Sequence, residues 1–436
     1  MDARWQKVLI SDLGLLVHIL DMPAANSVAC GVLVRAGTRD ERWPEEAGLA
    51  HALEHMIFQG TRDFPDSQSS SAYIEDVGGG LDAATSGEST LFYNQVPFLE
   101  IERAIYTLSQ LLLHSTFGED RIKPEMQNVI QEIRMTRDNA QEHLLEWAKS
   151  LTYGRHPLGR PTLGTEKAVA KFERRHFQSF YSHYYNRNNF DFIIVGRIDS
   201  VNQVIDLIRK YFADLPDGPP NDREIITKIG GRNNFSFENR DLEQVHIAML
   251  APTVKGACRE ARALGVFEAM IGGGASFPLF VEVREKSGLC YEIWADHALF
   301  SDISVFVAYV GTDPRRYKEA VEKIFKVIRS AKDDAVLLEK SKKRMTGGLA
   351  LQYDNPLKVL VGSASIIGLY GNGRDYSEII KEIQSISIGE VEAVVDQYLL
   401  YNPHAAFTFA YMAPNDLFPT QQLDLGESMC LGFDCL

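Results

Sequence analysis

The order of strand and helix patterns repeats along this chain of 436 residues. Each half contains β-rich apolar runs, a glycine-containing loop and helices with apolar residues at helical spacing, although the residues themselves differ. Residues 216–224, PDGPPNDRE, combine prolines, a glycine and charges, and so cannot join a regular element. The pattern predicts an α+β protein with two related domains, at 1–215 and 225–415, joined by a linker at 216–224. Residues 416–436 form a tail with no assigned role.

Charge and composition exclude several classes of protein. Fifty-nine acidic against 45 basic residues give a net charge of −14, which argues against a nucleic-acid partner. Five cysteines with scattered spacing do not predict a disulfide framework, and Cys430 and Cys435 lack the second pair that a metal site of that type needs. The first apolar run is interrupted by Ser11, Asp12 and Gly14, and no run is long enough to span a membrane. We therefore expect a cytoplasmic protein.

The segment GLAHALEHMIFQGT, residues 48–61, carries the strongest chemical signal. His51 and His55 are four residues apart, so on a helix they share one face and can bind one ion. Glu54 lies beside them and could accept a proton from water instead of binding the metal. The alternative is an ordinary amphipathic helix that carries two histidines. A catalytic zinc site would need a third protein ligand from elsewhere.

A carboxylate on a second helix could supply that ligand. One long helix without internal breakers is predicted at 122–151, and Glu125 and Glu132 lie two turns apart on one of its faces. By itself this spacing also fits a solvent-exposed acidic stripe, so both interpretations stay open at this point.

The chain resembles the M16 (pitrilysin-type) inverzincin metallopeptidases. HALEH, followed 77 residues after His55 by Glu132, resembles their inverted zinc motif and its distant glutamate. The segments GGGLDAATSGESTLFY, HPLGRPTLGT and GGGASFPLFVEVREKSGLCYEI also resemble segments of that family. The likeness extends to about residue 415. It is to the short two-domain form, similar to the mitochondrial processing peptidase beta subunit and bacterial M16B peptidases.

The resemblance implies a role for each residue of the motif. His51, His55 and Glu132 would bind one Zn²⁺ ion, Glu54 would be the general base, and Glu125 would orient a metal ligand. The implied activity is that of a zinc metalloendopeptidase that hydrolyses unfolded peptides or a peptide precursor. The alternative is a non-catalytic scaffold or partner subunit of an M16-type heterodimer.

The resemblance also implies how substrate would bind. Arg284 and Tyr291 would reach it from the second domain, with the tyrosine near the developing oxyanion. LDAATS, residues 81–86, would be an edge strand on which a peptide lies, with substrate-binding residues Asp82, Ala83, Ala84 and Thr85. Asp82 stands where relatives commonly have asparagine, and an ionised carboxylate only accepts hydrogen bonds.

The overall arrangement implied by the resemblance is two homologous α/β-roll domains, each an antiparallel sheet covered by helices, that form a clam-like shell. The expected partners are peptide substrates and a second chain, as a homodimer or as a heterodimer with a related M16 subunit. Neither a nucleic acid nor a membrane is an expected partner.

Overall fold

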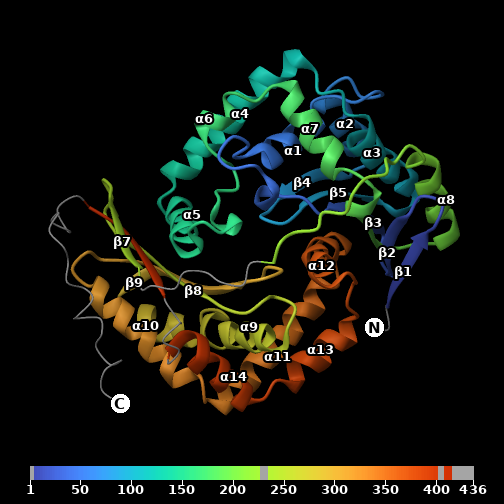
Figure 1. Ribbon diagram of the computed structural model, residues 1–436. Helices are drawn as coiled ribbons and strands as arrows, with labels where there is room; N and C mark the ends of the chain where they lie inside the picture. Colours follow the sequence, from blue (N-terminus) through green and yellow to red (C-terminus); the bar gives the residue numbers. More distant parts are fainter. Residues whose placement is uncertain (1–3, 226–233, 401–406, 415–436) are drawn as a thin grey trace. The chain divides into compact units, whose positions relative to one another are not determined.

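The computed structural model describes residues 4–225, 234–400 and 407–414 (Figure 1). Their contacts group into two compact units whose segments interleave along the chain. So far as they are described, the first unit comprises Met1–Met135, Arg160–Glu224 and Gly348–Ile380, and the second comprises Thr136–Gly159, Ile225–Gly347 and Lys381–Leu436. The predicted domain boundaries stay predictions. Cys430, Cys435 and the tail at 416–436 lie outside the described residues. No helix within the described ranges combines the length and the apolar character needed to cross a membrane.

The first unit is built on a six-stranded sheet in the order β1-β2-β6-β3-β5-β4. Its strands are β1 (Trp5–Ile10), β2 (Leu15–Asp21), β3 (Ser27–Val34), β4 (Gly80–Thr85), β5 (Thr90–Pro97) and β6 (Phe190–Gly196). All neighbours are antiparallel except β2 and β6, which are parallel. This one pair departs from the predicted antiparallel sheet, because a long crossover separates β2 from β6 and allows them to run the same way. Strand β4 lies at an edge of this sheet.

The second unit repeats this plan with a five-stranded sheet in the order β7-β11-β8-β10-β9. Its strands are β7 (Asn234–Asn239), β8 (Val245–Pro252), β9 (Cys290–Ala298), β10 (Val305–Thr312) and β11 (Thr408–Ala413). Again one pair is parallel, β7 with β11, and the other pairs are antiparallel. The prediction of two related α+β domains, each with its own sheet, is confirmed in this respect.

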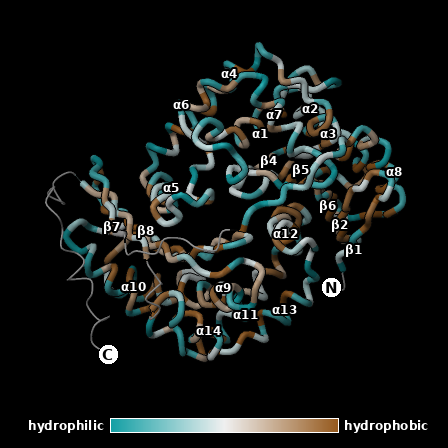
Figure 2. The backbone as a smooth tube through the Cα atoms, viewed as in Figure 1, coloured by the Kyte–Doolittle hydropathy of each residue, from teal (hydrophilic) through white to brown (hydrophobic). Residues whose placement is uncertain are grey.

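Helices cover both faces of the first sheet. The helices on this unit's main apolar core are α1 (Leu49–Phe58), α2 (Ser67–Glu75), α3 (Ile101–His114), α4 (Glu119–Asp138), α6 (Glu166–Val169), α7 (Arg174–Tyr184) and α8 (Val201–Tyr211). The opposite face is covered by α12 (Pro356–Tyr370), whose Leu360 and Ile367 join a separate core with Leu33 and Ile193. Figure 2 shows α12 as a largely apolar helix, as expected for a helix packed on a buried sheet.

The second sheet is covered in the same way. Its main core contains α9 (Arg259–Gly272), α10 (Tyr317–Ala331), α11 (Ala335–Gln352) and α14 (Ile388–Val395), and α13 (Tyr376–Ser385) precedes α14 in the chain. The other face is covered by α5 (Ala140–Tyr153), where Leu144 and Ala148 join a core with Ala248 and Val307. Figure 1 shows α5, in teal, against strands coloured yellow to red. The first sheet is therefore covered on its second face by α12, from the C-terminal half of the sequence. The second sheet is covered there by α5, from the N-terminal half.

The predicted helix at 122–151 is wrong as a single element. The structure has two helices, α4 and α5, separated at Asn139. Asn139 has extended backbone angles (φ −73°, ψ 110°), and its side-chain oxygen accepts hydrogen bonds from the amides of Gln141 and Glu142. This is the geometry of a helix N-cap, and asparagine is one of the best residues for that position. The sequence contained no glycine or proline at the break, but it did contain a capping residue.

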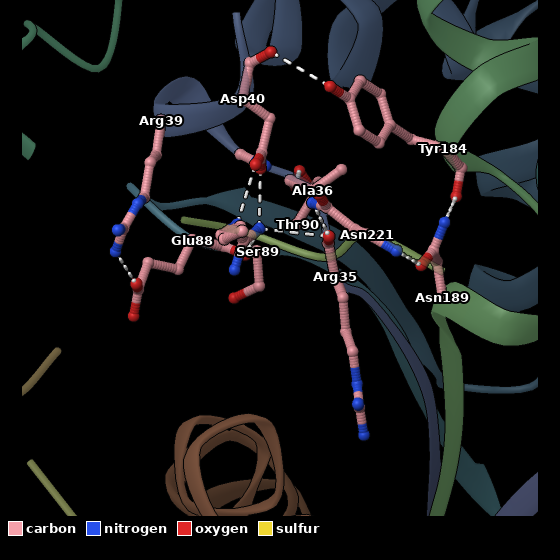
Figure 3. A network of polar contacts seen from close by, with 12 residues as sticks. Arg35, Ala36, Arg39, Asp40, Glu88, Ser89, Thr90, Tyr184, Asn189 and Asn221 are labelled. Carbon is pink, nitrogen blue, oxygen red and sulfur yellow. Dashed lines mark hydrogen bonds and ion pairs between the residues drawn. The ribbon is translucent and has the colours of Figure 1, made fainter. Parts of the chain in front are cut away.

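Residues 216–224 are irregular, and they are held on the first unit by side-chain contacts (Figure 3). The guanidinium of Arg223 donates to both carboxylate oxygens of Asp40, at 2.7 and 2.6 Å, and to the carbonyl of Arg35 at 3.0 Å. The side-chain amide of Asn221 donates to the same carbonyl at 2.6 Å. Residues 216–224, called the strap below, are therefore bound to the first unit and do not form a free linker.

Candidate metal centre

Helix α1 carries both histidines, and its N-terminus is fixed by buried groups. Gly48 precedes the helix with φ 92°, and a Cβ there would lie 2.4 Å from the carbonyl oxygen of Leu163, so the position requires glycine. The carboxylate of Glu41 accepts hydrogen bonds from the amides of Gly48 and Ala50, each at 3.0 Å. Burial raises the pKa of Glu41 to about 8, although these two amides favour its ionised form. These contacts fix the start of the motif helix through residues other than the candidate metal ligands.

Three potential ligand atoms meet at one point beside α1. The Nε2 atoms of His51 and His55 lie 3.3 Å apart, and the Oε2 atom of Glu132 on α4 lies 3.6 and 3.4 Å from them. Within the described part of the chain, this is the group of acidic, histidine or cysteine residues that could hold a metal ion. The expected juxtaposition of HALEH with the distant Glu132 is thus present.

The spacing and chemistry of these atoms fit zinc. A tetrahedral ion with ligands at about 2.05 Å separates its ligand atoms by about 3.3 Å, close to all three distances found here. The Nδ1 atom of His55 contacts the carboxylate of Glu125, so its Nε2 is the ring nitrogen that faces His51 and Glu132. Burial and the neighbouring His55 lower the pKa of His51 to about 4, which favours the neutral, ligand-competent imidazole.

Glu125 orients His55 from the far side of its ring. His55 Nδ1 donates to Glu125 Oε1 at 2.7 Å, and Oε2 of Glu125 accepts from Gln59 at 2.8 Å and Asn128 at 3.2 Å. Burial by itself would lower the pKa of His55, but the carboxylates of Glu125 and Glu132 outweigh it and raise that pKa to about 9. A carboxylate behind a histidine ligand fixes its tautomer and increases its basicity.

Glu54 lies one residue before His55, and its carboxylate points to strand β4. Its Oε2 atom accepts a hydrogen bond from the hydroxyl of Thr85 at 2.5 Å. Burial raises the pKa of Glu54; the bond from Thr85 and the nearby His55 act against this shift, while Asp82 adds to it. A partly buried carboxylate with a raised pKa beside a metal site is suited to accept and return a proton.

Strand β4 offers an open edge close to this carboxylate. Its residues alternate, so that Leu81, Ala83 and Thr85 are half-buried whereas Asp82 and Ala84 are exposed. The carboxylate of Asp82 accepts from the hydroxyl of a tyrosine on β5 at 3.0 Å and from the amide of Ala83 at 2.8 Å. Of the four predicted substrate-binding residues, Asp82 and Ala84 thus present side chains outward, and Thr85 turns its hydroxyl toward Glu54.

Arg284 and Tyr291 lie together in the second unit. Arg284 is in a π-helical segment, Leu279–Glu285, and Tyr291 is near the start of β9. The guanidinium carbon of Arg284 is 4.8 Å from the centre of the Tyr291 ring, a cation–π contact. The tyrosine is 75% exposed. Their predicted reach to substrate at the metal site stays a prediction, since they and the metal site belong to separate units.

Sequence reasoning missed several residues that support the site. Gln59 and Asn128 hold Glu125, and Glu41 caps α1. Two of them carried a usable signal, because Gln59 is four residues after His55 and Asn128 is three after Glu125, the spacings that place side chains on one helix face. Glu41 carried none, since it precedes the helix in an irregular segment.

Comparison with known proteins places this geometry in a family. A family model described as insulinase (peptidase family M16) matches residues 16–166, and one described as peptidase M16 inactive domain matches residues 171–345. A protein of Rickettsia felis named an uncharacterized zinc protease is 29% identical over 414 residues, covering 93% of this chain and 96% of the relative. The Bacillus subtilis protein named uncharacterized zinc protease YmxG is 27% identical over 416 residues, covering 93% and 98%.

Solved structures share the fold. A protease from Helicobacter pylori matches with a TM-score of 0.84 at 19% identity, covering 94% of this chain and all of that one. A structure from Pseudomonas fluorescens described as a peptidase M16 inactive domain matches with a TM-score of 0.84 at 16% identity, covering 94% and 98%. The matched family models, together with relatives that are similar over nearly their whole length, show that this chain belongs to the M16 peptidase family.

Proposed function

We propose that the chain is a zinc-dependent endopeptidase that hydrolyses unfolded peptides or a peptide precursor. The observation that supports this most directly is the triangle of ligand atoms from His51, His55 and Glu132, with the carboxylate of Glu54 beside it. Relatives that are named zinc proteases support zinc as the metal, and we propose one ion per chain. The donor set of two imidazoles and a carboxylate also suits a catalytic zinc site that keeps a position open.

Different residues of the chain would have different roles in this hydrolysis. When bound, zinc would polarise the scissile carbonyl and lower the pKa of the attacking water. Glu54 would accept the proton of that water and pass it to the leaving amine. Glu125 would keep His55 in the tautomer and orientation that binding requires. In the role implied by the family resemblance, Tyr291 and Arg284 would donate hydrogen bonds to substrate and to the developing negative charge.

The open edge of β4 supports a peptide as substrate. Backbone amide and carbonyl groups on an edge strand can pair with any extended chain, so recognition would depend on backbone more than on sequence. Such binding requires the substrate to be unfolded, at least over the paired residues. It also predicts broad specificity, with outward-facing Asp82 and Ala84 as the side chains that adjust it.

The test is hydrolysis of a pool of unfolded peptides by the purified protein, with bound zinc measured in the same samples. Glu54→Gln should abolish hydrolysis and keep the metal, because it removes the proton acceptor but no ligand. Glu45→Gln is the matched control, since Glu45 is exposed and lies just before the same helix. Folded wild-type protein that binds no zinc would contradict the proposal. Zinc binding with no cleavage of any peptide in the pool would favour the scaffold or partner-subunit alternative.

A further inference from the structure

We infer that Thr85 is a positioning residue for this hydrolysis: its hydroxyl holds Oε2 of Glu54 and leaves Oε1 to exchange the proton. The inference rests on the proposed function, in which Glu54 is the base. It gives Thr85 a role distinct from the direct substrate contact that the family resemblance implies for it.

The position of Thr85 is set by the sheet. It is the last residue of β4 and pairs with Thr90, the first residue of β5. Strand alternation turns its side chain inward, on the same face as Leu81 and Ala83, where it meets the carboxylate of Glu54. A donor fixed on a hydrogen-bonded hairpin is held more firmly than one on a loop.

The direction of each hydrogen bond follows from the available protons. The hydroxyl of Thr90 donates to the carbonyl oxygen of Ala36 at 3.0 Å, and a carbonyl can only accept, so the single proton of Thr90 is used there. The ionised carboxylate of Glu54 can likewise only accept, so the proton of Thr85 points to Oε2. The two hydroxyl oxygens are 3.4 Å apart, and neither has a second proton to share.

The other oxygen of Glu54 is in a different position. Among the described residues, no hydrogen-bond donor contacts Oε1 of Glu54. That oxygen therefore keeps its lone pairs for a water proton. Without Thr85, the two oxygens become equivalent, and the long glutamate side chain regains rotamer freedom that opposes a single reactive orientation.

The experiment compares Thr85→Val with Thr85→Ser. Valine keeps the branched shape and removes the donor, whereas serine keeps the donor. We expect Thr85→Val to lower kcat by about 10- to 100-fold with little change in KM or in bound zinc. Thr85→Ser should remain within about three-fold of wild type, because it can still make the hydrogen bond. Thr107→Val is the matched control, since Thr107 is fully buried on α3 and, among the described residues, its hydroxyl bonds only the backbone of its own helix.

Several results would overturn the inference. The first is a Thr85→Val variant whose kcat equals that of wild type. The second is a Thr85→Ser variant whose kcat falls as far as that of Thr85→Val. The third is a Thr85→Val variant whose lower activity comes from a higher KM or from less bound zinc. These differ from failure of the proposed function, which would show as an inactive wild type or an active Glu54→Gln. In that case crystal structures decide the positioning claim, which requires Glu54 to keep one orientation in wild type and Thr85→Ser but not in Thr85→Val.

Discussion

Replacement of Glu125 by glutamine tests how far the metal centre depends on a residue that does not bind the metal. Its carboxylate accepts from His55, Gln59 and Asn128 at 2.7, 2.8 and 3.2 Å, and the residue is only 8% exposed. A carboxamide keeps the shape but offers one accepting oxygen, and its nitrogen can only donate. In Glu125→Gln at least one of the three donors therefore loses its acceptor, and His55 loses the charge behind its ring.

We expect zinc affinity to fall by about 10- to 100-fold, the usual effect of removing a partner of a ligating histidine. This corresponds to about 1.4–2.8 kcal/mol of binding free energy. The ligand atoms themselves remain, so binding should be weakened and not abolished. The dissociation constant can be measured by competition with a chromophoric chelator at fixed pH.

The matched control is Glu119→Gln, which makes the same change at an exposed position of the same helix. Its zinc affinity should equal that of wild type. An unchanged dissociation constant in Glu125→Gln would refute the reasoning, as would an equal weakening in both variants.

Two further predictions concern stability. Removing Arg223 leaves the buried carboxylate of Asp40 with the Gly37 amide but without its ion-pair partner, so Arg223→Met should lower the free energy of unfolding by about 3 kcal/mol. The control is Arg175→Met, because Arg175 forms an exposed ion pair with Glu173 and its loss should cost less than about 1 kcal/mol. Both free energies of unfolding can be measured by chemical denaturation. Equal losses in the two variants would contradict the claim that Arg223 binds residues 216–224 to the first unit. Burial and then Asp296 raise the folded-state pKa of Glu268 to about 7, above the ordinary 4.5, so its contribution to wild-type stability falls as pH rises through that interval. Glu268→Gln should therefore gain stability over wild type between pH 4.5 and 7, by at most about 3 kcal/mol, and a pH-independent difference would contradict this.

Local patterns in the sequence were enough for much of the candidate site. The four-residue spacing of His51 and His55 guarantees a shared face once α1 forms, and apolar residues at helical spacing predict that helix. Glu54 follows from its place inside the same turn. These features depend on neighbours along the chain, so they can be inferred without the fold.

The third ligand could not be settled in that way. Before the family resemblance was considered, the spacing of Glu125 and Glu132 fitted a solvent-exposed stripe better than a metal site, because the spacing of two carboxylates does not tell what lies opposite them. The break at Asn139 was also missed, since asparagine occurs both inside and at the ends of helices, and only the adopted backbone angles distinguish the two.

The sequence by itself determined the two-fold repeat of sheet and helices, the metal-binding face of α1 and the family to which they belong. Tertiary structure alone decided which helix covers the second face of each sheet, and that the strap at 216–224 is bound through Arg223. It also turned the hydroxyl of Thr85 toward Glu54. The physical reason is range: spacing along the chain fixes which side chains share a face, but contacts between distant segments arise only when those faces pack together.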